Sequence, residues 1–317
     1  MKGQIYPTKY GYQVRFGRKL TKHFKNLGDA ERFLNGIRFK MDEGTFDIRD
    51  YQRGNPMGFQ NLAEKWLDMK FQTVKPGTSC SLKNFINQAV AWWGSVNIKN
   101  IGSGEIEDFI FHDKNISNKT RSNLKSCLHD FFKWVSRRER IPMPEFPEVP
   151  FELGWRNIID LDTQQKVLDE IYRISWHLNP KIYLGIHLLR TYVSIRPGEL
   201  VNVKERQIDL KMGAIIIPHP KEKRPKIAFL MDDDIDLIKS IPRGLPDLFY
   251  FRHGPGRGGI TPGEKFGSKY FLKWWKKACD NLGVEGVDLY GGTRHSTVTA
   301  LGKICTPEEV KDASGHS

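Results

Sequence analysis

A proline-rich stretch, PMPEFPEVP, divides this sequence and limits what it can fold into. Residues 142–150 contain four prolines in nine positions. Each proline fixes φ at about −65° and lacks the backbone N–H that helices and central strands need, so this stretch is predicted to be an extended, semi-rigid connector. The chain is therefore expected to form separate domains on either side of it.

Two regions with different hydrophobic patterns precede the connector. In residues 1–50, aromatic and β-branched residues alternate with polar ones over positions 6–10 and 12–16, which predicts short strands. A helix with Asp29 as its N-cap is expected to follow. The polar segment 50–57, with Gly and Pro, is typical of a linker.

Residues 58–143 are predicted to form a small helical domain without strands. Apolar residues recur there at helical spacing in four successive groups. The groups are Leu62, Trp66 and Met69; Phe85, Ala89 and Trp92; Ile106, Phe109 and Ile110; and a stretch that Thr120 opens, with Leu124, Leu128, Phe131, Phe132 and Val135.

Residues 151–317 follow the connector and have a mixed pattern. Helices are predicted at 162–174, 182–192, 234–241 and 268–282, and two strands at 214–218 and 227–231, around a basic turn. The predicted fold class is therefore α+β and mainly α, with three domains at 1–50, 58–143 and 151–317.

The composition points to a polyanionic partner. Lys and Arg outnumber Asp and Glu by 50 to 37, which gives a formal net charge of +13. Such an excess favours nucleic acid or an anionic membrane surface, although a generically basic soluble protein would show it too. The sequence has no apolar run of about 18 residues and no signal peptide, so a membrane partner is not expected. Four dispersed cysteines without a CxxC pair argue against a zinc site, and a cytoplasmic protein that binds double-stranded DNA without metal or cofactor is expected.

Basic residues gather in two places upstream of the connector. The first 25 residues contain seven Lys and Arg and no acid. A small sheet with a basic face can lie against phosphates or in a DNA groove, but a solvated charged sheet fits the pattern equally well. Other basic residues lie at the predicted helix ends and loops of 58–143. The candidates for DNA binding are Arg15, Arg18, Lys19, Lys119, Arg121 and Lys125.

Basic residues of the C-terminal region are of the kind that phosphodiester cleavage requires. Without a metal, the reaction needs cations to neutralise the charge on phosphorus, an acid for the leaving oxygen and a nucleophile. Arg196 precedes Pro197, which suits a first helical turn, and Glu199 could hold the guanidinium in place. Lys221 enters the predicted turn between the two strands. A surface ion pair and a solvated hairpin tip are the ordinary alternatives for these residues.

Arg294, in YGGTRHS, and His316, in ASGHS, complete the series. A lone histidine is more often structural than catalytic, so His316 is a weak signal by itself. No group of closely spaced metal ligands stands out in the sequence.

The ordered set resembles the tyrosine recombinases, or phage-type integrases. Arg196-Pro-Gly-Glu-Leu is similar to the first conserved box of that family, Arg294-His-Ser to the second, and Gly315-His316-Ser317 to the Gly-His-Ser that closes it. Each motif is unspecific, but their order and spacing are specific. Residues 58–143 resemble the family's helical core-binding (SAM-like) domain, and residues 1–50 resemble its arm-type DNA-binding module.

The resemblance implies a role for each matching residue. Arg196 and Arg294 would clamp the scissile phosphate, because their planar forks suit two oxygens each. Lys221 would be the general acid toward the 5′ oxygen, with Lys223 as the alternative. His316 would hydrogen-bond the phosphate or the attacking group. Glu199 would support the site, and His295 is expected to pack rather than react.

The implied function is that of a site-specific recombinase of bacterial or phage origin. It would cleave and rejoin DNA through a 3′-phosphotyrosyl bond, as a homotetramer on its attachment site, to integrate or excise a mobile element. Two departures stand against this. The family usually has a His where this sequence has Gly291, for which Tyr290 could partly substitute. Its nucleophilic Tyr follows the Gly-His-Ser, whereas this sequence ends at Ser317.

The catalytic domain is therefore expected to be incomplete at its C-terminus and inactive as it stands. A non-catalytic DNA-binding protein, or a degraded integrase remnant, is the main alternative. A type IB topoisomerase shares the chemistry but fits the N-terminal region and the spacing of the boxes less well.

Overall fold

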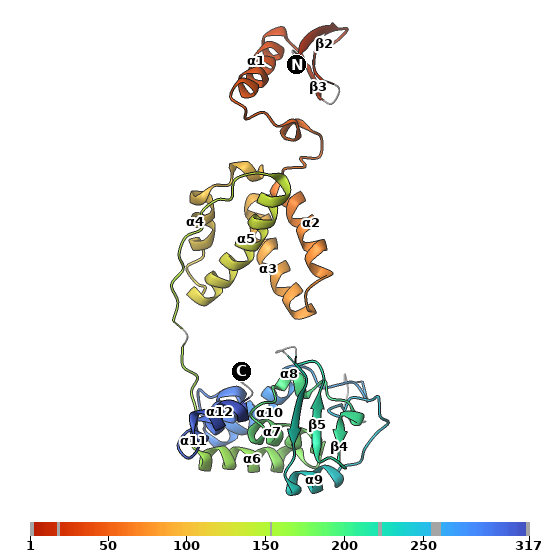
Figure 1. Ribbon diagram of the computed structural model, residues 1–317, viewed down its shortest axis with the longest axis vertical. Coiled ribbons are helices and arrows are strands. Elements are labelled where there is room, and N and C mark those ends of the chain that lie inside the picture. Colours follow the sequence, from red (N-terminus) through yellow and green to blue (C-terminus); the bar gives the residue numbers. More distant parts are fainter. Residues whose placement is uncertain (1–2, 18–19, 153, 221–223, 255–260, 315–317) are drawn as a thin grey trace. The chain divides into compact units, whose positions relative to one another are not determined.

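The computed structural model describes residues 3–17, 20–152, 154–220, 224–254 and 261–314. The chain divides into two compact units, residues 1–153 and 154–317 (Figure 1). The proline-rich residues 142–150 have no regular secondary structure and lie at the end of the first unit. Helices dominate both units and each contains one small sheet, so the predicted fold class, α+β and mainly α, is confirmed.

A three-stranded antiparallel sheet begins the first unit. Its strands are β1 (Gln4–Thr8), β2 (Gly11–Phe16) and β3 (Leu20–Phe24), in that order, and helix α1 (Leu27–Asp42) packs against them. The N-cap of α1 is Asn26 and not Asp29, because the Asn26 side chain accepts a hydrogen bond from the Asp29 backbone N–H. The sheet and the helix enclose a core of Val14, Phe16, Leu20, Ala30, Leu34 and Ile37.

A separate core holds together the helical part of the first unit. Its α-helices and 3-10 segment are α2 (Phe59–Phe71), α3 (Pro76–Trp93), η2 (Ile98–Asn100), α4 (Ser103–Phe111) and α5 (Asn118–Glu139). The 3-10 segment η1 (Ile48–Tyr51) comes before them, and its Ile48 and Tyr51 pack against the core of the sheet and α1. The predicted buried face of α3 is wrong by one residue: it buries Ile86, Ala89 and Trp93, while Trp92 is 49% exposed. Both sets are apolar and have helical spacing, so the sequence alone could not choose between them.

The segment predicted to be a linker, residues 50–57, is partly built into the first unit. Met57 is buried in the helical core. Just before this segment, Arg49 forms ion pairs with Asp47 and with Glu139 at the end of α5. Lys99 adds an ion pair to Asp47 at 2.6 Å. These contacts fasten the chain that leaves α1 to the helical part.

The second unit packs helices around a small sheet. In chain order it contains α6 (Leu161–Ser175), α7 (Pro180–Thr191), α8 (Pro197–Leu200), η3 (Glu205–Gln207), β4 (Ile208–Asp209), β5 (Ala214–Ile217), β6 (Lys226–Phe229), α9 (Asp232–Lys239), α10 (Tyr270–Leu282), the π-helical turn η4 (Gly291–His295), α11 (Ser296–Leu301) and α12 (Pro307–Ser314). The strands are antiparallel in the order β4-β5-β6.

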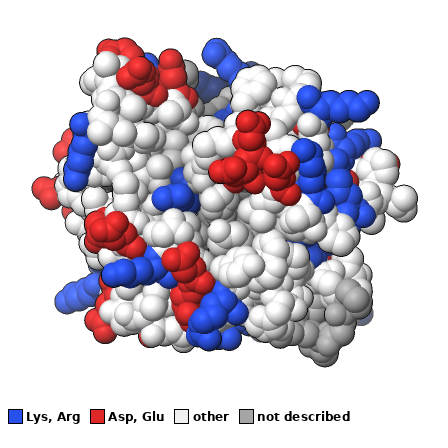
Figure 2. Space-filling model, turned by 90° about the horizontal axis from the view of Figure 1, so that it is seen from below, with Lys and Arg blue, Asp and Glu red and all other residues white. Residues whose placement is uncertain are grey.

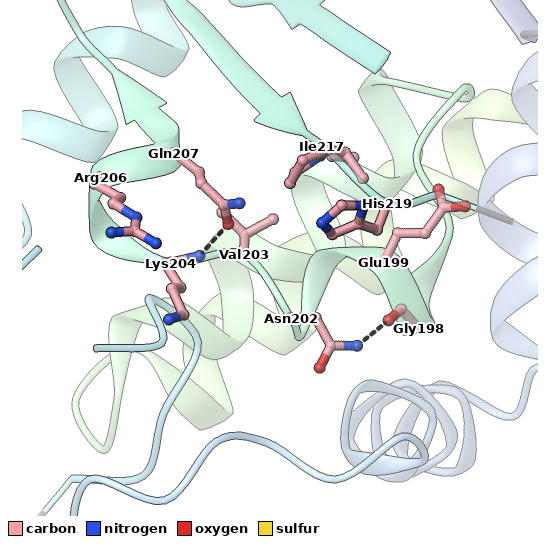
Figure 3. Close-up of a pocket in the computed structure, with 10 residues that line it drawn as sticks. Gly198, Glu199, Asn202, Val203, Lys204, Arg206, Gln207, Ile217 and His219 are labelled. Carbon is pink, nitrogen blue, oxygen red and sulfur yellow. Dashed lines mark hydrogen bonds between the residues drawn. The ribbon is translucent and has the colours of Figure 1, made fainter. Parts of the chain in front are cut away.

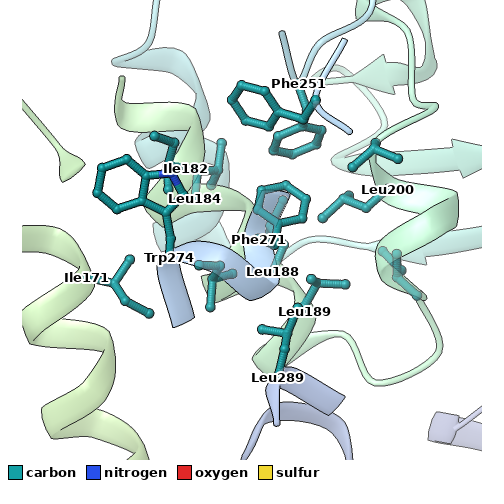
Figure 4. Close-up of a cluster of buried hydrophobic side chains, with 14 of the residues drawn as sticks. Ile171, Ile182, Leu184, Leu188, Leu189, Leu200, Phe251, Phe271, Trp274 and Leu289 are labelled. Atoms are coloured by element: carbon teal, nitrogen blue, oxygen red, sulfur yellow. The ribbon is translucent and has the colours of Figure 1, made fainter. Parts of the chain in front are cut away.

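Three helices supply nearly half of the buried residues in the core of the second unit. Helix α7 packs against α6 and α10. Figure 4 shows Ile171 of α6, Leu188 of α7, and Phe271 and Trp274 of α10 in one cluster of buried side chains. Burial of large apolar side chains of this kind stabilises a fold by roughly 1.5–3 kcal/mol for each side chain. This rigid core positions the loops that follow α7 and α10.

Two buried carboxylates tie other elements to this core. Asp234 of α9 lies 2.7 Å from His187 Nε2 and also accepts a hydrogen bond from the Tyr192 hydroxyl. Burial alone would raise the pKa of Asp234, but these hydrogen bonds outweigh it, and the pKa lies below its usual value. Glu205 of η3 is 1% exposed and pairs with Arg252 at 2.5 Å, which likewise lowers its pKa despite burial.

No helix among the described residues is both long and apolar enough to cross a membrane.

Candidate active site

Arg196 stands at the start of helix α8, directly after the loop that leaves α7. It is the N-cap residue of α8, and Pro197 occupies the first helical position, as expected. Glu199 accepts hydrogen bonds from the Arg196 backbone N–H at 3.2 Å and from its Nη1 at 3.4 Å. The Glu199 side chain is 9% exposed and that of Arg196 is 22% exposed. A buried carboxylate therefore orients a guanidinium that still reaches the surface.

Lys226 is a third member of this group that sequence reasoning did not select. It begins strand β6, and its Nζ donates to the Ser194 carbonyl at 3.2 Å and to Glu199 Oε2 at 3.4 Å. Glu199 is thus shared between two cations, and Lys226 links the β5–β6 hairpin to the loop that carries Arg196. Lys226 lies in the predicted basic turn between the two strands, but only its place in the β5–β6 register reveals this contact. The predicted Lys221 and Lys223 lie outside the described residues.

Arg294 lies in the π-helical turn η4 and is only 5% exposed. Its Nη2 donates to the carbonyl of Ser314, at the end of α12, at 2.8 Å. The guanidinium also lies over the Tyr290 ring, 5.9 Å from its centroid. The predicted His316 comes two residues after Ser314 and lies outside the described residues.

Close packing explains why two glycines precede Thr293 and Arg294. A Cβ on Gly291 would lie 2.3 Å from the Asn157 carbonyl oxygen, and one on Gly292 would lie 2.0 Å from Trp275 Cζ2. No side chain, histidine included, fits at Gly291 without moving the backbone at Asn157. Tyr290 does lie near the arginine, and its ring is also 5.5 Å from that of His295.

Buried polar contacts join the turn η4 to helices α6 and α7. Gln164 of α6 is fully buried, and its amide donates to the Gly292 carbonyl at 2.7 Å. Arg190 of α7 donates to the Gln164 side-chain oxygen at 3.0 Å. Gln164 was also missed by the sequence analysis. The available signal was a long uncharged polar side chain on the helix face that buries Val167, Leu168 and Ile171.

A cavity of about 340 Å³ lies next to Glu199. Figure 3 shows its lining, which comes from α8, the following loop, η3, and the end of β5 with the two residues after it. The lining includes His219, and Lys204 and Arg206 lie at the end occupied by Gln207. Lys204 and Arg206 both pair with Asp247, at 3.9 and 2.8 Å. Of the group formed by Arg196, Glu199 and Lys226, Glu199 thus lines a hollow that also has Lys204, Arg206 and His219 in its lining.

The proposed DNA-binding residues of the first unit differ in their surroundings. Arg15 is exposed on β2 and donates to Gln13 at 2.7 Å. Lys119 is exposed near the start of α5, with its Nζ 4.1 Å from the centroid of the Phe151 ring. Lys125 is half-buried on α5. Arg18 and Lys19 lie outside the described residues.

Arg121 is tied into the structure rather than extended into solvent. Its guanidinium donates to Asn118 Oδ1 at 2.7 Å and to the Asp113 carbonyl. It therefore holds the loop between α4 and α5, and a phosphate contact would have to use its remaining donor capacity.

The distribution of surface charge and the placement of potential metal ligands both bear on what the site can bind. The face drawn in Figure 2 shows acidic and basic side chains interspersed around a broad uncharged area, rather than one continuous basic patch. Within the described ranges, no group of three or more His, Cys, Asp or Glu side chains is placed to hold a metal ion. The site thus consists of cations held by carboxylate and carbonyl groups, which suits the binding of a phosphate oxyanion.

No family model matches the sequence, and no curated protein matches it either. Solved structures do match. A lambda integrase tetramer bound to a Holliday junction is 14% identical, with a TM-score of 0.66 over 99% of this chain and 95% of that one. A lambda integrase dimer bound to a COC′ core site is 15% identical, with a TM-score of 0.63 over 99% of this chain and 91% of that one.

The Tn1549 transposon integrase in complex with transposon right end DNA is 16% identical, with a TM-score of 0.61 over 82% of this chain and 92% of that one. The chain therefore has the fold of these integrases. The expected tyrosine-recombinase fold is confirmed.

Proposed function

We propose that the protein is a site-specific DNA recombinase that cleaves and rejoins strands through a 3′-phosphotyrosyl intermediate, for integration or excision of a mobile element. The observation that carries the proposal is the group formed by Arg196, Glu199 and Lys226. An arginine fork oriented by a buried carboxylate, with a lysine from the neighbouring hairpin, suits a scissile phosphate. The shared fold supports the proposal, since the lambda and Tn1549 integrases were solved on DNA.

In the proposed reaction, Arg196 and Arg294 bind the non-bridging oxygens of the phosphate. A tyrosine hydroxyl gives up its proton to solvent as its oxygen attacks phosphorus, the bond to the 5′ oxygen breaks, and that oxygen receives a proton from Lys221, with Lys223 as the alternative donor. His316 hydrogen-bonds the phosphate or the attacking oxygen. A 5′ hydroxyl of a partner strand then attacks the phosphotyrosine and restores the phosphodiester. The covalent bond conserves the phosphodiester energy, so the reaction needs neither metal nor ATP.

Glu199 has a supporting role in this proposal. It forms ion pairs with Arg196 and Lys226, so it fixes the direction in which the Arg196 guanidinium points. We propose that double-stranded DNA is the partner, that the protein assembles as a homotetramer on it, and that it works in the cytoplasm of a bacterial cell. The division into an arm-type module at 1–50, a core-binding domain at 58–143 and a catalytic domain from 151 belongs to the same proposal.

DNA binding can be tested apart from catalysis. The affinity for a duplex should fall steeply with salt, because each phosphate contact releases condensed counterions. Arg196→Ala should change this affinity little, because one of many phosphate contacts is lost. A salt-independent affinity would rule out the nucleic-acid function. An equal loss of affinity and of strand cleavage in Arg196→Ala would argue against a catalytic role for that residue.

A further inference from the structure

Gln164 is a polar side chain buried where an apolar one would be expected. It is 0% exposed and lies on the face of α6 that also buries Val167, Leu168 and Ile171. A buried amide costs free energy unless its hydrogen bonds are made, so its partners show what the side chain does at this place.

The partners of Gln164 lie in the turn that carries Arg294. Its Nε2 donates to the Gly292 carbonyl at 2.7 Å, and lies 3.3 Å from the Thr293 carbonyl and 3.2 Å from Thr297 Oγ1. Thr293 is the residue directly before Arg294. The amide nitrogen therefore hydrogen-bonds to the backbone of the turn immediately before Arg294.

Arg190 fixes which way the amide faces. Its Nε donates to Gln164 Oε1 at 3.0 Å, and an arginine can only donate. The oxygen of the amide must face Arg190, so the nitrogen must face the carbonyls of the turn. The orientation follows from the chemistry of the partners and not from an arbitrary assignment of the amide atoms.

The turn itself needs such support. Residues Gly291–His295 form a π-helical turn, which is wider than an α-helix and rarely stable alone. On its other sides, Ser296 Oγ donates to the Gly291 carbonyl at 2.9 Å, and the indole ring of Trp275 fills the space next to Gly292. Gln164 completes this enclosure from α6.

We propose that Gln164 is a positioning residue that holds η4 in the shape that presents the Arg294 guanidinium to a phosphate. The inference rests on the proposed function, because it takes Arg294 as a phosphate ligand. It adds a residue on a distant helix that acts on the phosphate only through Arg294. Arg190 supports the same positioning role, because it orients the side-chain amide of Gln164.

Inorganic phosphate is the probe for the test, with its dissociation constant measured by calorimetry at low ionic strength. Gln164→Glu keeps the side-chain shape but removes the donor to the carbonyls. Gln165→Glu is the matched control, since it makes the same change one residue away at an exposed position that contacts Asp169. Gln164→Met, which is neutral, separates the loss of the donor from the added charge and serves if the Glu variant fails to fold. Each variant is made in the native background and in an Arg294→Lys background.

We expect both Gln164 variants to weaken phosphate binding by about tenfold in the native background and by less than about twofold in Arg294→Lys, because residues that act through one another are not additive. Gln165→Glu should change nothing. Equal weakening of phosphate binding in both backgrounds would mean that Gln164 has a merely structural role, and it would overturn the inference. No weakening in either background would overturn it as well. In both cases the proposed function would still stand. If Arg294→Lys alone left phosphate binding unchanged, the phosphate clamp itself would be refuted, and the role of Gln164 with it.

Discussion

Gly292→Ala tests whether the turn that carries Arg294 is packed as tightly as the structure shows. The added Cβ would lie 2.0 Å from Trp275 Cζ2, 2.7 Å from its Cη2 and 2.9 Å from its Cε2. The indole is fully buried, and its Nε1 donates to the Val287 carbonyl at 3.2 Å. The ring is therefore held by a hydrogen bond at the edge that faces Gly292, and it cannot swing away freely.

The expected cost follows from the displacement required. An ordinary contact begins at about 3.4 Å, so the ring or the turn must move by about 1.4 Å. Overpacking of this kind costs about 1–3 kcal/mol. The preference of a helical backbone for Ala over Gly acts in the opposite direction by about 1 kcal/mol. Because the approach to Trp275 is as short as 2.0 Å, we take the upper end of the overpacking range, about 3 kcal/mol. After the opposing preference of about 1 kcal/mol, we expect Gly292→Ala to destabilise the second unit by about 2 kcal/mol, whereas without the clash it would stabilise it.

The assay is urea unfolding combined with hydrogen exchange of peptides from η4 and α10. Peptide-level exchange is needed because the two units need not unfold together. Gly267→Ala is the control, since nothing lies within 4 Å of a Cβ there, and its effect should stay within about 0.5 kcal/mol. A Gly292→Ala protein as stable as the native one, or more stable, would refute the packing described for this turn.

Three further changes test other parts of the structure. Gly291→His introduces the side chain that tyrosine recombinases usually have at this place. It should destabilise the second unit by more than about 2 kcal/mol, because its Cβ would lie 2.3 Å from the Asn157 carbonyl oxygen. A melting temperature that did not fall in thermal unfolding would contradict this. The lowered pKa of Asp234 favours its ionised form in the folded state, so its contribution is complete above the unfolded pKa of about 4 and is lost as the pH falls toward the folded value. Asp234→Asn should therefore be less stable at pH 7 and lose less stability on acidification, and a parallel acid profile in urea unfolding would refute this. Arg49→Ala should make protease cleave residues 44–56 about fivefold faster, as expected if the lost ion pairs contribute about 1 kcal/mol to holding this segment. Arg53→Ala, at an exposed position, should leave the cleavage rate unchanged. Equal cleavage rates in the two variants would contradict the fastening role of Arg49.

Local features of the site could be predicted from the sequence because they depend on neighbours along the chain. Pro197 at the first helical position and the contact between Arg196 and Glu199 involve residues three positions apart or fewer. The helices of both units are found close to the predicted positions for the same reason, since apolar spacing reports the helical period.

Features that depend on distant segments could not be predicted. Lys226 reaches the Arg196 loop only because the β5–β6 register turns it that way, and Gln164 meets η4 across 128 positions of sequence. Gly291 could be noticed as an unusual residue, but the Asn157 carbonyl that forbids a side chain there lies on another segment. The buried face of α3 was ambiguous because both candidate faces are apolar. Tertiary packing decides each of these cases.

The central claim is that Arg196 serves phosphodiester cleavage, and covalent trapping tests it most directly. The product of the complete reading frame is incubated with a pool of duplexes that carry nicks at varied positions. A cut just upstream of a nick releases a short 5′-hydroxyl fragment, so rejoining fails and the protein–DNA bond accumulates. Mass spectrometry should find DNA joined through a 3′ phosphate to a tyrosine, and Arg196→Ala should bind the duplexes but form no adduct. Tight DNA binding without any adduct from the native protein would contradict the recombinase function and favour a non-catalytic DNA-binding protein.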